Sequence, residues 1–446
     1  MLLYAMHDAM MKAMPDNPMA PCLAESWTMA PDGLSYAFTL RKGVLFHNGE
    51  ALTAEDVKFS LERYRGAANK TLKERVAGVD IHDPHRLTIR SNEPWPDFLT
   101  FYAGATGAGW IVPKKYVQQV GEDGFKKAPI GAGPYKFVVV HARRRAGVRG
   151  VRGLLAQGAG HQAAGLQGDP RRSDAAGGLA ARRDRHRLFD PRRAGRRADA
   201  HARPRDQAGG GIGAVLALLP EQWDPQSPWH DRRVRLAANL ALDRKTINQA
   251  LTLGYSRLTG SIFPENFDFY WQPPEPVYDP GRARKLLAEA GHARGFDAGD
   301  YYCDASYANI GEVVLNNLRE VGIRVKLRPL ERAAFFKAYS EKKLKNIVQG
   351  ASGAFGNCAT RAEAFVVKGG AYAYGSYPDI DALFAEQAVQ MDRAKREAIL
   401  QRLQQLVHDK AIYAPIWQLA FISGVGPKVG QSGFRADQGL CLHGAL

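Results

Sequence analysis

Three stretches in the carboxy-terminal half of the chain carry side chains that could hold a small molecule. They combine aromatic rings with a carboxylate, an amide and a guanidinium: Tyr301, Tyr302, Asp304, Phe355, Asn357, Arg361 and Tyr374. Aromatic surfaces supply apolar contact, and a few polar groups placed among them supply orientation. This mixture suits a peptide, an opine or a sugar. We therefore predict a ligand-binding cleft lined by loops that contain these residues.

Each of these residues could also have a purely structural role. The tyrosines could pack in the core or at its rim, since most of a tyrosine ring is apolar. Asp304 could cap the N-terminus of a helix. Arg361 could be a solvated or salt-bridged surface residue. The sequence alone leaves both interpretations of each residue open.

Motifs of catalysis and metal binding are absent from the sequence. There is no GxSxG nucleophile elbow, no Walker or dinucleotide-binding glycine pattern and no HExxH pair. We therefore predict that the protein is not an enzyme and has no cofactor. The cysteines Cys22, Cys303, Cys358 and Cys441 form no CxxC pair and no zinc-ligand spacing. Cys303 and Cys358 could pair in an oxidising compartment, but we predict free, partly buried thiols.

The elements that open the fold are clearest in residues 23–64. Apolar residues at 36, 38 and 40 alternate with polar or small ones, which is typical of a half-buried strand. Val44 and Phe46 indicate a second strand, and His47 begins a turn at His47-Asn48-Gly49. Thr53 is placed to cap a helix whose first turn carries acidic residues. This order is strand, turn, strand, turn, helix.

The exact amino-acid pattern of residues 23–64 is more informative than its hydrophobic periodicity. The pattern LAESW…PDGL.Y.F.LRKGV.FHNGE.LTAEDVKFSLE resembles the signature of the family 5 extracellular solute-binding proteins, which serve ABC importers of oligopeptides, dipeptides and nickel. Residues 131–137 (GAGPYKF) resemble the GxGPY.F crossover of that family. The resemblance implies an α/β, two-lobed periplasmic-binding-protein-like fold with discontinuous domains.

The resemblance also implies a function and partners. It predicts a monomeric periplasmic receptor that captures a peptide or peptide-like small molecule and delivers it to an ABC permease in the membrane. In peptide-binding members, an Asp in the loop that matches residues 355–357 holds the α-amino group of the ligand. This chain has Gly356 and Asn357 there and no acid in register, so the resemblance does not extend to that contact.

The carboxy-terminal half predicts an α/β lobe. Asp279 and Pro280 indicate the start of a helix that Gly291 stops, and residues 310–320 indicate another helix followed by a strand at 323–327. A long helix is expected at 392–406 and an apolar strand at 413–421. Helix-to-strand units of this kind build α/β domains.

Together these features divide the chain into five parts. We predict a remnant of the first domain at 1–22, a small second domain at 23–135, a first-domain segment at 136–240, a third domain that forms the ligand lobe at 241–425, and a return to the first domain at 426–446.

Residues 141–206 differ from the rest in composition. They contain 17 arginines and 6 aspartates but no lysine or glutamate, so they carry 11 of the chain's 16 net positive charges. Arginine without lysine is expected when GC-rich DNA is translated out of frame, because CGN codons multiply. Residues 183–192 can be back-translated with suitable codons and read again one base later. This gives EIDIAYSIR, which resembles the sequences of the family 5 solute-binding proteins. We therefore predict that 141–215 and 435–446 are out of frame, that 141–215 is disordered, and that solute binding is impaired.

The arginine-rich segment could instead have a role of its own. The net charge could favour nucleic acid, bound through residues 141–206. Proteins that bind single strands interleave aromatic residues with basic ones, and this segment contains only Phe189. We therefore predict no nucleic-acid partner, and keep nucleic-acid binding and a non-functional pseudogene product as alternatives.

The N-terminal residues lack the features of a secretory signal. Residues 1–14 have no basic start, no long apolar run and no cleavage site. We expect residues 1–20 to be a helical remnant, the signal and the first strand to be missing, and export of this product to be doubtful. No run of about 18 apolar residues predicts a membrane span.

Overall fold

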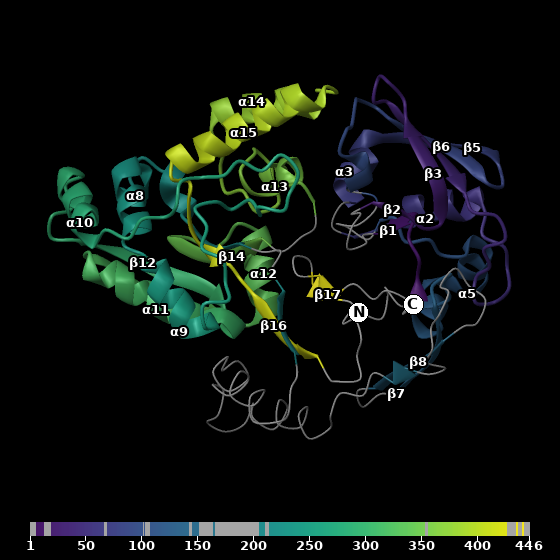
Figure 1. Cartoon of the computed structure of the whole chain (residues 1–446), viewed down its shortest axis with the longest axis horizontal. Coiled ribbons are helices and arrows are strands. Elements are labelled where there is room, and N and C mark those ends of the chain that lie inside the picture. The colour runs from purple at the N-terminus through teal and green to yellow at the C-terminus, as the bar shows by residue number, and fades with distance from the viewer. Residues whose placement is uncertain are drawn as a thin grey trace. The chain divides into compact units, whose positions relative to one another are not determined.

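A computed structural model describes residues 6–12, 19–66, 69–100, 102, 108–141, 145–150, 164–165, 205–209, 214–352, 356–425, 434–435 and 439–440 (Figure 1). The chain divides into two compact units. Unit 1 is Met1–Asp190 with Leu440–Leu446, and unit 2 is Pro191–Gly439. Each unit is described by itself.

Unit 1 contains a four-stranded antiparallel sheet in the order β3-β4-β6-β5. Its strands are β3 (Ala24–Met29), β4 (Ser35–Leu40), β5 (Val76–Asp83) and β6 (Arg86–Ser91). The alternation predicted for β4 is confirmed, since Tyr36, Phe38 and Leu40 are all buried in one core. The strand predicted around Val44 and Phe46 is wrong: both are buried, but only an isolated bridge between Leu45 and Ala51 forms there.

Helices of unit 1 are α2 (Ala54–Arg63), α3 (Asn69–Arg75), α4 (Phe98–Thr100) and α5 (Lys114–Lys127). The predicted cap of α2 is confirmed, since the Thr53 amide and hydroxyl both donate to Asp56 Oδ2, at 2.9 and 3.0 Å. The helical remnant expected over 1–20 is wrong for residues 7–12 and 19–20; of the described residues in this range, only Met6 is helical. Met11–Lys12 (β1) pairs with Ala20–Pro21 (β2), because Met10 and Met11 enter the core as extended chain.

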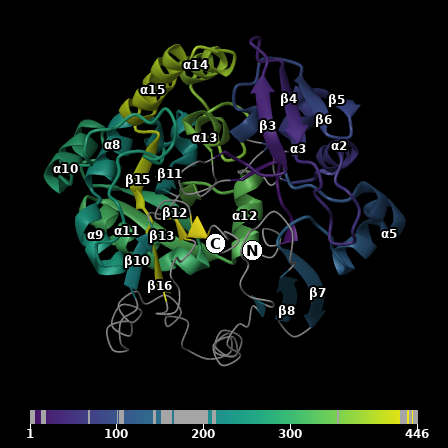
Figure 2. The ribbon, with the colours of Figure 1, turned by 45° about the vertical axis from the view of Figure 1, so that its right-hand side comes forward.

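Unit 2 is built on a five-stranded mixed sheet in the order β13-β12-β14-β11-β15 (Figure 2). Its strands are β11 (Ala214–Leu218), β12 (Phe296–Asp304), β13 (Ile323–Leu330), β14 (Ile347–Ser352) and β15 (Tyr413–Gln418). β12 runs parallel to β13 and β14, whereas β11 runs antiparallel to β14 and β15. β11 and β15 are buried along their whole length, whereas charged residues of β13 alternate with its apolar ones and are exposed.

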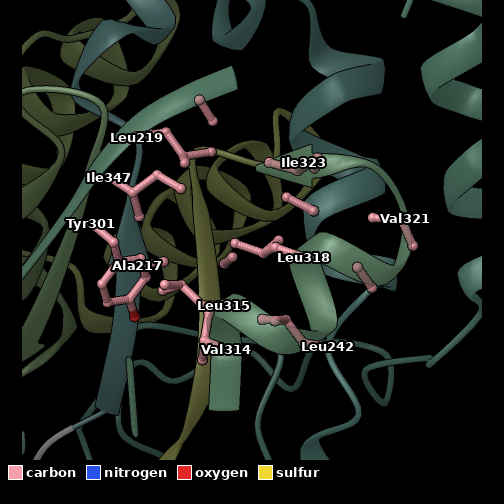
Figure 3. Close-up of a cluster of buried hydrophobic side chains, with 14 of the residues drawn as sticks. Ala217, Leu219, Leu242, Tyr301, Val314, Leu315, Leu318, Val321, Ile323 and Ile347 are labelled. Carbon is pink, nitrogen blue, oxygen red and sulfur yellow. The ribbon is translucent and has the colours of Figure 1, made fainter. Parts of the chain in front are cut away.

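Helices cover the two faces of this sheet. They are α8 (Arg232–Leu240), α9 (Arg244–Thr252), α10 (Pro280–Glu289), α11 (Ala308–Glu320), α12 (Arg332–Ser340), α13 (Cys358–Phe365), α14 (Pro378–Ala388) and α15 (Arg393–Asp409), with short 3₁₀ helices η2 (Pro220–Trp223), η3 (Pro228–His230) and η4 (Ala305–Tyr307). Side chains from α8, α10 and α11 form one core with the sheet (Figure 3). Side chains from α12, α13 and α15 form a second core on the other face.

The predicted helix starts and stops of this lobe are largely confirmed. The Asp279 side chain accepts a hydrogen bond from the Arg282 amide at 2.8 Å, and Gly291 takes a φ of +88° just past the end of α10. Two consecutive helices, α8 and α9, open this lobe. The second helix starts with its own cap, since Asp243 accepts from the Thr246 amide at 3.0 Å.

Parts of the segments predicted to be out of frame have strand backbone. β7 (Tyr135–His141) pairs with β8 (Arg145–Gly150), and β8 pairs with β9 (Ala164–Gly165). β10 (Arg205–Gly209) pairs with β16 (Phe421–Val425), and β17 (Phe434–Arg435) forms a two-stranded sheet with β18 (Gly439–Leu440). The other residues of 141–213 and 436–446 lie outside the described residues. In the described part of the chain, no helix is long and apolar enough to cross a membrane.

Candidate functional site

Polar residues from several strands lie together where the strands of the five-stranded sheet end. Tyr301 pairs with Ile347 across the parallel strands β12 and β14, so these strands end at the same edge. β11 begins there and β15 ends there, because Ala214 pairs with both Ser352 and Gln418. We call this the carboxyl edge. In open α/β sheets, ligands bind in the crevice outside the carboxyl ends of the strands.

Asp304 is the last residue of β12 and stands at the carboxyl edge. Its side chain accepts a hydrogen bond from the Ser306 amide at 2.9 Å, so the predicted role as a helix cap is confirmed. Its other oxygen accepts from Arg332 Nη1 at 2.7 Å. The Asp304 carboxylate is only 5% exposed, whereas the Arg332 side chain is 60% exposed. The negative charge of Asp304 is therefore buried and partly neutralised from the solvent side.

Asn357 begins α13, in the connection that follows β14. The Asn357 amide donates to Thr360 Oγ1 at 3.0 Å, and the Thr360 amide donates back to Asn357 Oδ1 at 3.0 Å, which completes a capping box. Gly356 precedes this box with a φ of +154°, and a Cβ there would lie 2.2 Å from Thr360 Oγ1. The loop can reach its cap in this form only because residue 356 has no side chain.

Arg361 lies one turn into α13 and is buried, with 4% of its surface exposed. The interpretation of Arg361 as a surface residue is therefore wrong. Its guanidinium carbon lies 5.2 Å from the centre of the Phe267 ring and 5.4 Å from that of Phe365. Burial lowers the pKa of Arg361 to about 10, so it stays cationic at neutral pH. Two aromatic rings therefore lie within cation–π distance of this charge.

The two tyrosines of β12 point to opposite faces of the sheet, since side chains alternate along a strand. They were predicted in a loop, but both are inside β12. Tyr301 is completely buried in the core beneath α11 (Figure 3), and its hydroxyl donates to Gln349 Oε1 at 3.0 Å. Tyr302 is half-buried, and its hydroxyl donates to Asp300 Oδ2 at 3.2 Å. Tyr301 is therefore a core residue, because its side chain lies on the face of the sheet that α11 covers.

Tyr374 lies at the opposite edge of the sheet. Its ring stacks on Tyr339 with the centroids 6.0 Å apart, and its hydroxyl donates to the Tyr339 carbonyl at 3.5 Å, near the end of α12. The structure therefore brings Asp304 to the carboxyl edge and Asn357 and Arg361 to the helix that follows β14, but not Tyr374. Phe355 lies outside the described residues.

The predicted thiols are free and buried. Cys303 packs in the core on one face of the sheet, and Cys358 packs in the core on the other face. Burial raises the pKa of the Cys303 thiol to about 12. Neither thiol is placed to react or to cross-link to the other.

Comparison with known proteins decides the family. The family model described as bacterial extracellular solute-binding proteins, family 5 Middle, matches residues 18–147 and 191–373. The chain belongs to this family. The match omits residues 148–190. It includes residues 191–215, which we predicted to be out of frame.

Individual relatives of this solute-binding protein agree. It is 27% identical over 449 residues to the probable di/tripeptide-binding protein 5 of Pseudomonas aeruginosa, covering 89% of this chain and 81% of that protein. It is 25% identical to the glutathione-binding protein GsiB of Salmonella choleraesuis, covering 72% of this chain and 64% of that protein. The chain thus spans less than two thirds of GsiB.

Solved structures confirm the fold predicted for this solute-binding protein. DppA of Helicobacter pylori, in complex with the peptide STSA, is similar at a TM-score of 0.79 and 20% identity, over 98% of this chain and 91% of that one. NikA of Brucella suis, in complex with Fe(III)-EDTA, is similar at a TM-score of 0.81 and 19% identity, over 99% and 94%. The two-lobed α/β fold is therefore shown. The family consists of solute-binding receptors rather than enzymes.

Some residues at the carboxyl edge of this solute-binding protein could not be found from the sequence. The Gln418 amide donates to the Arg257 carbonyl at 2.7 Å and the Arg257 amide donates back at 3.0 Å, which fixes the loop before residue 260 against β15. Ser256 Oγ accepts from the Ala420 amide at 3.1 Å. No motif marks these residues. The available signal was a polar residue, Gln418, at the end of the apolar run of β15.

A cavity of about 220 Å³ lies elsewhere in unit 2 of this solute-binding protein. Its walls come from α8, from the end of α15 and from residues 260–277, and its polar lining includes Arg232, Asn239 and Arg244. The Arg244 guanidinium donates to backbone oxygens of Pro415 and Asn239, at 2.7 and 2.9 Å. None of the predicted ligand residues lines this cavity.

Proposed function

We propose that this chain is the solute-binding receptor of an ABC importer, that it acts in the periplasm with a membrane permease, and that it captures a peptide or peptide-like small molecule. The names of its relatives support this class of ligand. The observation that carries the proposal is Arg361, a buried permanent cation held between two aromatic rings in the helix that follows β14. A peptide has one group that complements it, the terminal carboxylate.

The charge pattern favours recognition of the ligand's carboxylate over recognition of its amino group. Asn357 carries no charge, and its amide oxygen already accepts from Thr360. The buried carboxylate of Asp304 already has Arg332 as a partner. We propose that Arg361 is the main charged contact, because its guanidinium is cationic at neutral pH, with Asn357 shaping the loop and Tyr302 and Asp304 forming nearby walls.

We also propose that the chain as written binds more weakly than its ancestor. The gap in the family match at 148–190 falls inside the arginine-rich segment, which supports a one-base frameshift there. A first lobe built from out-of-frame residues would lack ligand contacts and strand partners. The five-part domain division proposed from the sequence depends on the same assumption.

Calorimetric titration with free and C-terminally amidated di- and tripeptides tests this function. We compare the chain as written, a frame-restored chain, and frame-restored chains carrying Arg361→Ala or, as a matched control, Arg324→Ala on the exposed face of β13. We expect the restored chain to bind free peptides, and Arg361→Ala and ligand amidation each to weaken binding about tenfold or more, or about 1.4 kcal/mol. Arg324→Ala should change nothing.

Two results would contradict the proposal. If the restored chain binds amidated and free peptides equally, Arg361 is not the carboxylate contact. If it binds no peptide while circular dichroism shows a folded protein, the ligand is not a peptide. Tight binding by the chain as written would show that the out-of-frame segments do not impair it.

A further inference from the structure

His47 holds the segment 131–134, which leads into β7 in unit 1. We call these residues the crossover segment. The Gly131 carbonyl accepts from the His47 amide at 2.9 Å, and the Gly133 amide donates to the Met6 carbonyl at 2.9 Å. The imidazole of His47 makes two further bonds, from Nε2 to the Gly133 carbonyl at 2.8 Å and from the Gly131 amide to Nδ1 at 3.3 Å. The sequence had identified His47 only as a turn residue.

These two bonds determine the protonation state of the ring. A carbonyl oxygen can only accept, so Nε2 of His47 carries a proton. A backbone amide can only donate, so Nδ1 of His47 must be unprotonated to accept from Gly131. The ring therefore fits this structure only in its neutral form. A proton on Nδ1 would place two N–H groups facing each other.

His7 also packs against the crossover segment. It is 4% exposed, and its Nδ1 has no hydrogen-bond partner in the described part of the chain. A Cβ on Gly131 would lie 2.6 Å from that nitrogen and 2.0 Å from the Met6 carbonyl oxygen, so the Gly131 backbone packs directly against His7. The buried imidazoles of His7 and His47 thus both lie against Gly131.

The charged groups around this pair do not favour an added proton. Asp8 is the carboxylate that acts on His47, but it forms an ion pair with Lys12 at 2.5 Å. Lys136 faces His47, and Arg63 acts on His7, with a further repulsion between the two histidines. Cys22 lies beside Asp8 and Lys12, and burial raises the pKa of its thiol to about 12, so it stays neutral. A proton on either ring would add a poorly compensated positive charge.

We propose that His47 and His7 form an acid-operated latch, which holds the crossover segment while both rings are neutral and releases it when they are protonated. Burial lowers the pKa of His47 below its ordinary value and lowers that of His7 to about 4. Because both are depressed in the folded protein, the latch is fully closed above about pH 6.5 and opens as the pH falls towards about 4. This device is independent of the ligand site of unit 2.

The first test is imidazole NMR of the full chain labelled at histidine. At pH 7.5 we expect a His47 signal of the neutral form with the proton on Nε2, and transitions of His47 and His7 below pH 6.5. Hydrogen–deuterium exchange of peptides covering 131–135, corrected for intrinsic rates, should be about tenfold faster or more at pH 4.5 than at pH 7.5, the ratio equivalent to one pKa unit. Peptides covering β4 should change less.

His47→Gln sharpens the test. A glutamine amide nitrogen can replace Nε2 as donor to the Gly133 carbonyl, but it cannot titrate. We expect this variant to lose the part of the acid dependence of exchange at 131–135 that comes from His47, and the double variant His47→Gln/His7→Phe to lose most of it. The control His82→Gln, at an exposed ring that contacts Thr88 Oγ1 at 2.9 Å, should retain it.

Two observations would overturn the latch. One is a His47 ring that is doubly protonated, or protonated on Nδ1, at pH 7.5. The other is an acid-dependent release that persists undiminished in the double variant His47→Gln/His7→Phe. If the variant does not fold, the tautomer and titration of the unmodified chain still decide the question.

Discussion

Unit 1 and unit 2 differ in the polar side chains that they bury. Among the described residues, the acidic and basic side chains buried in unit 1 are carboxylates and histidines: His7, Asp8, His47, Asp56 and Asp97. Those buried in unit 2 are mainly arginines, accompanied by many amides: Arg235, Arg244, Arg361, Arg396, Gln222, Asn248, Gln349, Asn357, Gln387, Gln404 and Gln418. Asp304 is the buried carboxylate of unit 2.

This difference in buried side chains predicts how the stability of each unit should respond to pH. Arginine keeps its charge over the whole physiological range, and amides have none to lose. Arg235 and Arg244 of unit 2 are bound by oxygens that do not titrate: Arg235, for example, donates to the Trp229 and His230 carbonyls at 2.8 and 2.7 Å. Histidine changes charge between about pH 5 and 8. Acid should therefore act on unit 1 first.

The largest expected effect comes from removing a buried arginine of unit 2. Arg244→Met keeps much of the apolar stem but removes the donors to the Pro415 and Asn239 carbonyls. We expect a loss of about 4 kcal/mol in the unfolding free energy of unit 2, since each buried group left without a partner costs about 1–3 kcal/mol. Denaturant titration followed by hydrogen exchange assigns the loss to one unit.

Arg282→Met, at an exposed position of α10, is the control for Arg244→Met and should change stability by less than about 0.5 kcal/mol. If Arg244→Met destabilises unit 1 as much as unit 2, the two units do not unfold separately and the comparison fails.

The next effect is the acid response of unit 1. The pKa of His7 is lowered from 6.5 to about 4 by burial, with His47 adding repulsion. A base whose pKa is depressed on folding contributes stability that is present above its unfolded pKa and is lost as the pH falls through the interval below it. We expect unit 1 to lose up to about 3 kcal/mol between pH 6.5 and 4, measured by thermal unfolding at several pH values.

Replacing His7 should remove most of this acid response. His7→Phe has no proton to gain and keeps an aromatic ring beside Phe125, whose centroid is 6.1 Å from that of His7. Unit 2 should change little over the same interval. Equal acid sensitivity of the two units would contradict the comparison.

The smallest effect concerns the buried carboxylate of unit 2. Asp304→Asn retains an acceptor for the Ser306 amide but loses the charge that pairs with Arg332. Because Arg332 is mostly exposed, we expect a loss of only about 0.5–1 kcal/mol. The control Asp300→Asn, whose partner Arg328 is also exposed, should cost no more. A loss above about 3 kcal/mol would show that Asp304 is a core charge rather than an edge cap.

Local structure followed from the sequence where the signal was local. The cap at Thr53, the alternation of β4, the start of α10 at Asp279 and the stop at Gly291 each depend on a few neighbouring residues, and the structure confirms them. The family also followed from the sequence, because the signature over residues 23–64 is long and continuous. The absence of catalytic motifs was also readable directly.

Long-range pairing decided the rest. Only the parallel register of β12 and β14 places Asp304 and the start of α13 at one edge, and only packing beneath α11 makes Tyr301 a core residue. Arg361 could not be assigned from sequence, because its two aromatic partners include Phe267, from a segment about ninety residues earlier in the chain. The sequence predicted only a turn at His47. The hydrogen bonds of its ring to Gly131 and Gly133 are visible only in the structure. Sequence specifies which groups are available, but burial and hydrogen-bond partners come from residues distant in the chain, and these set their charge and their role.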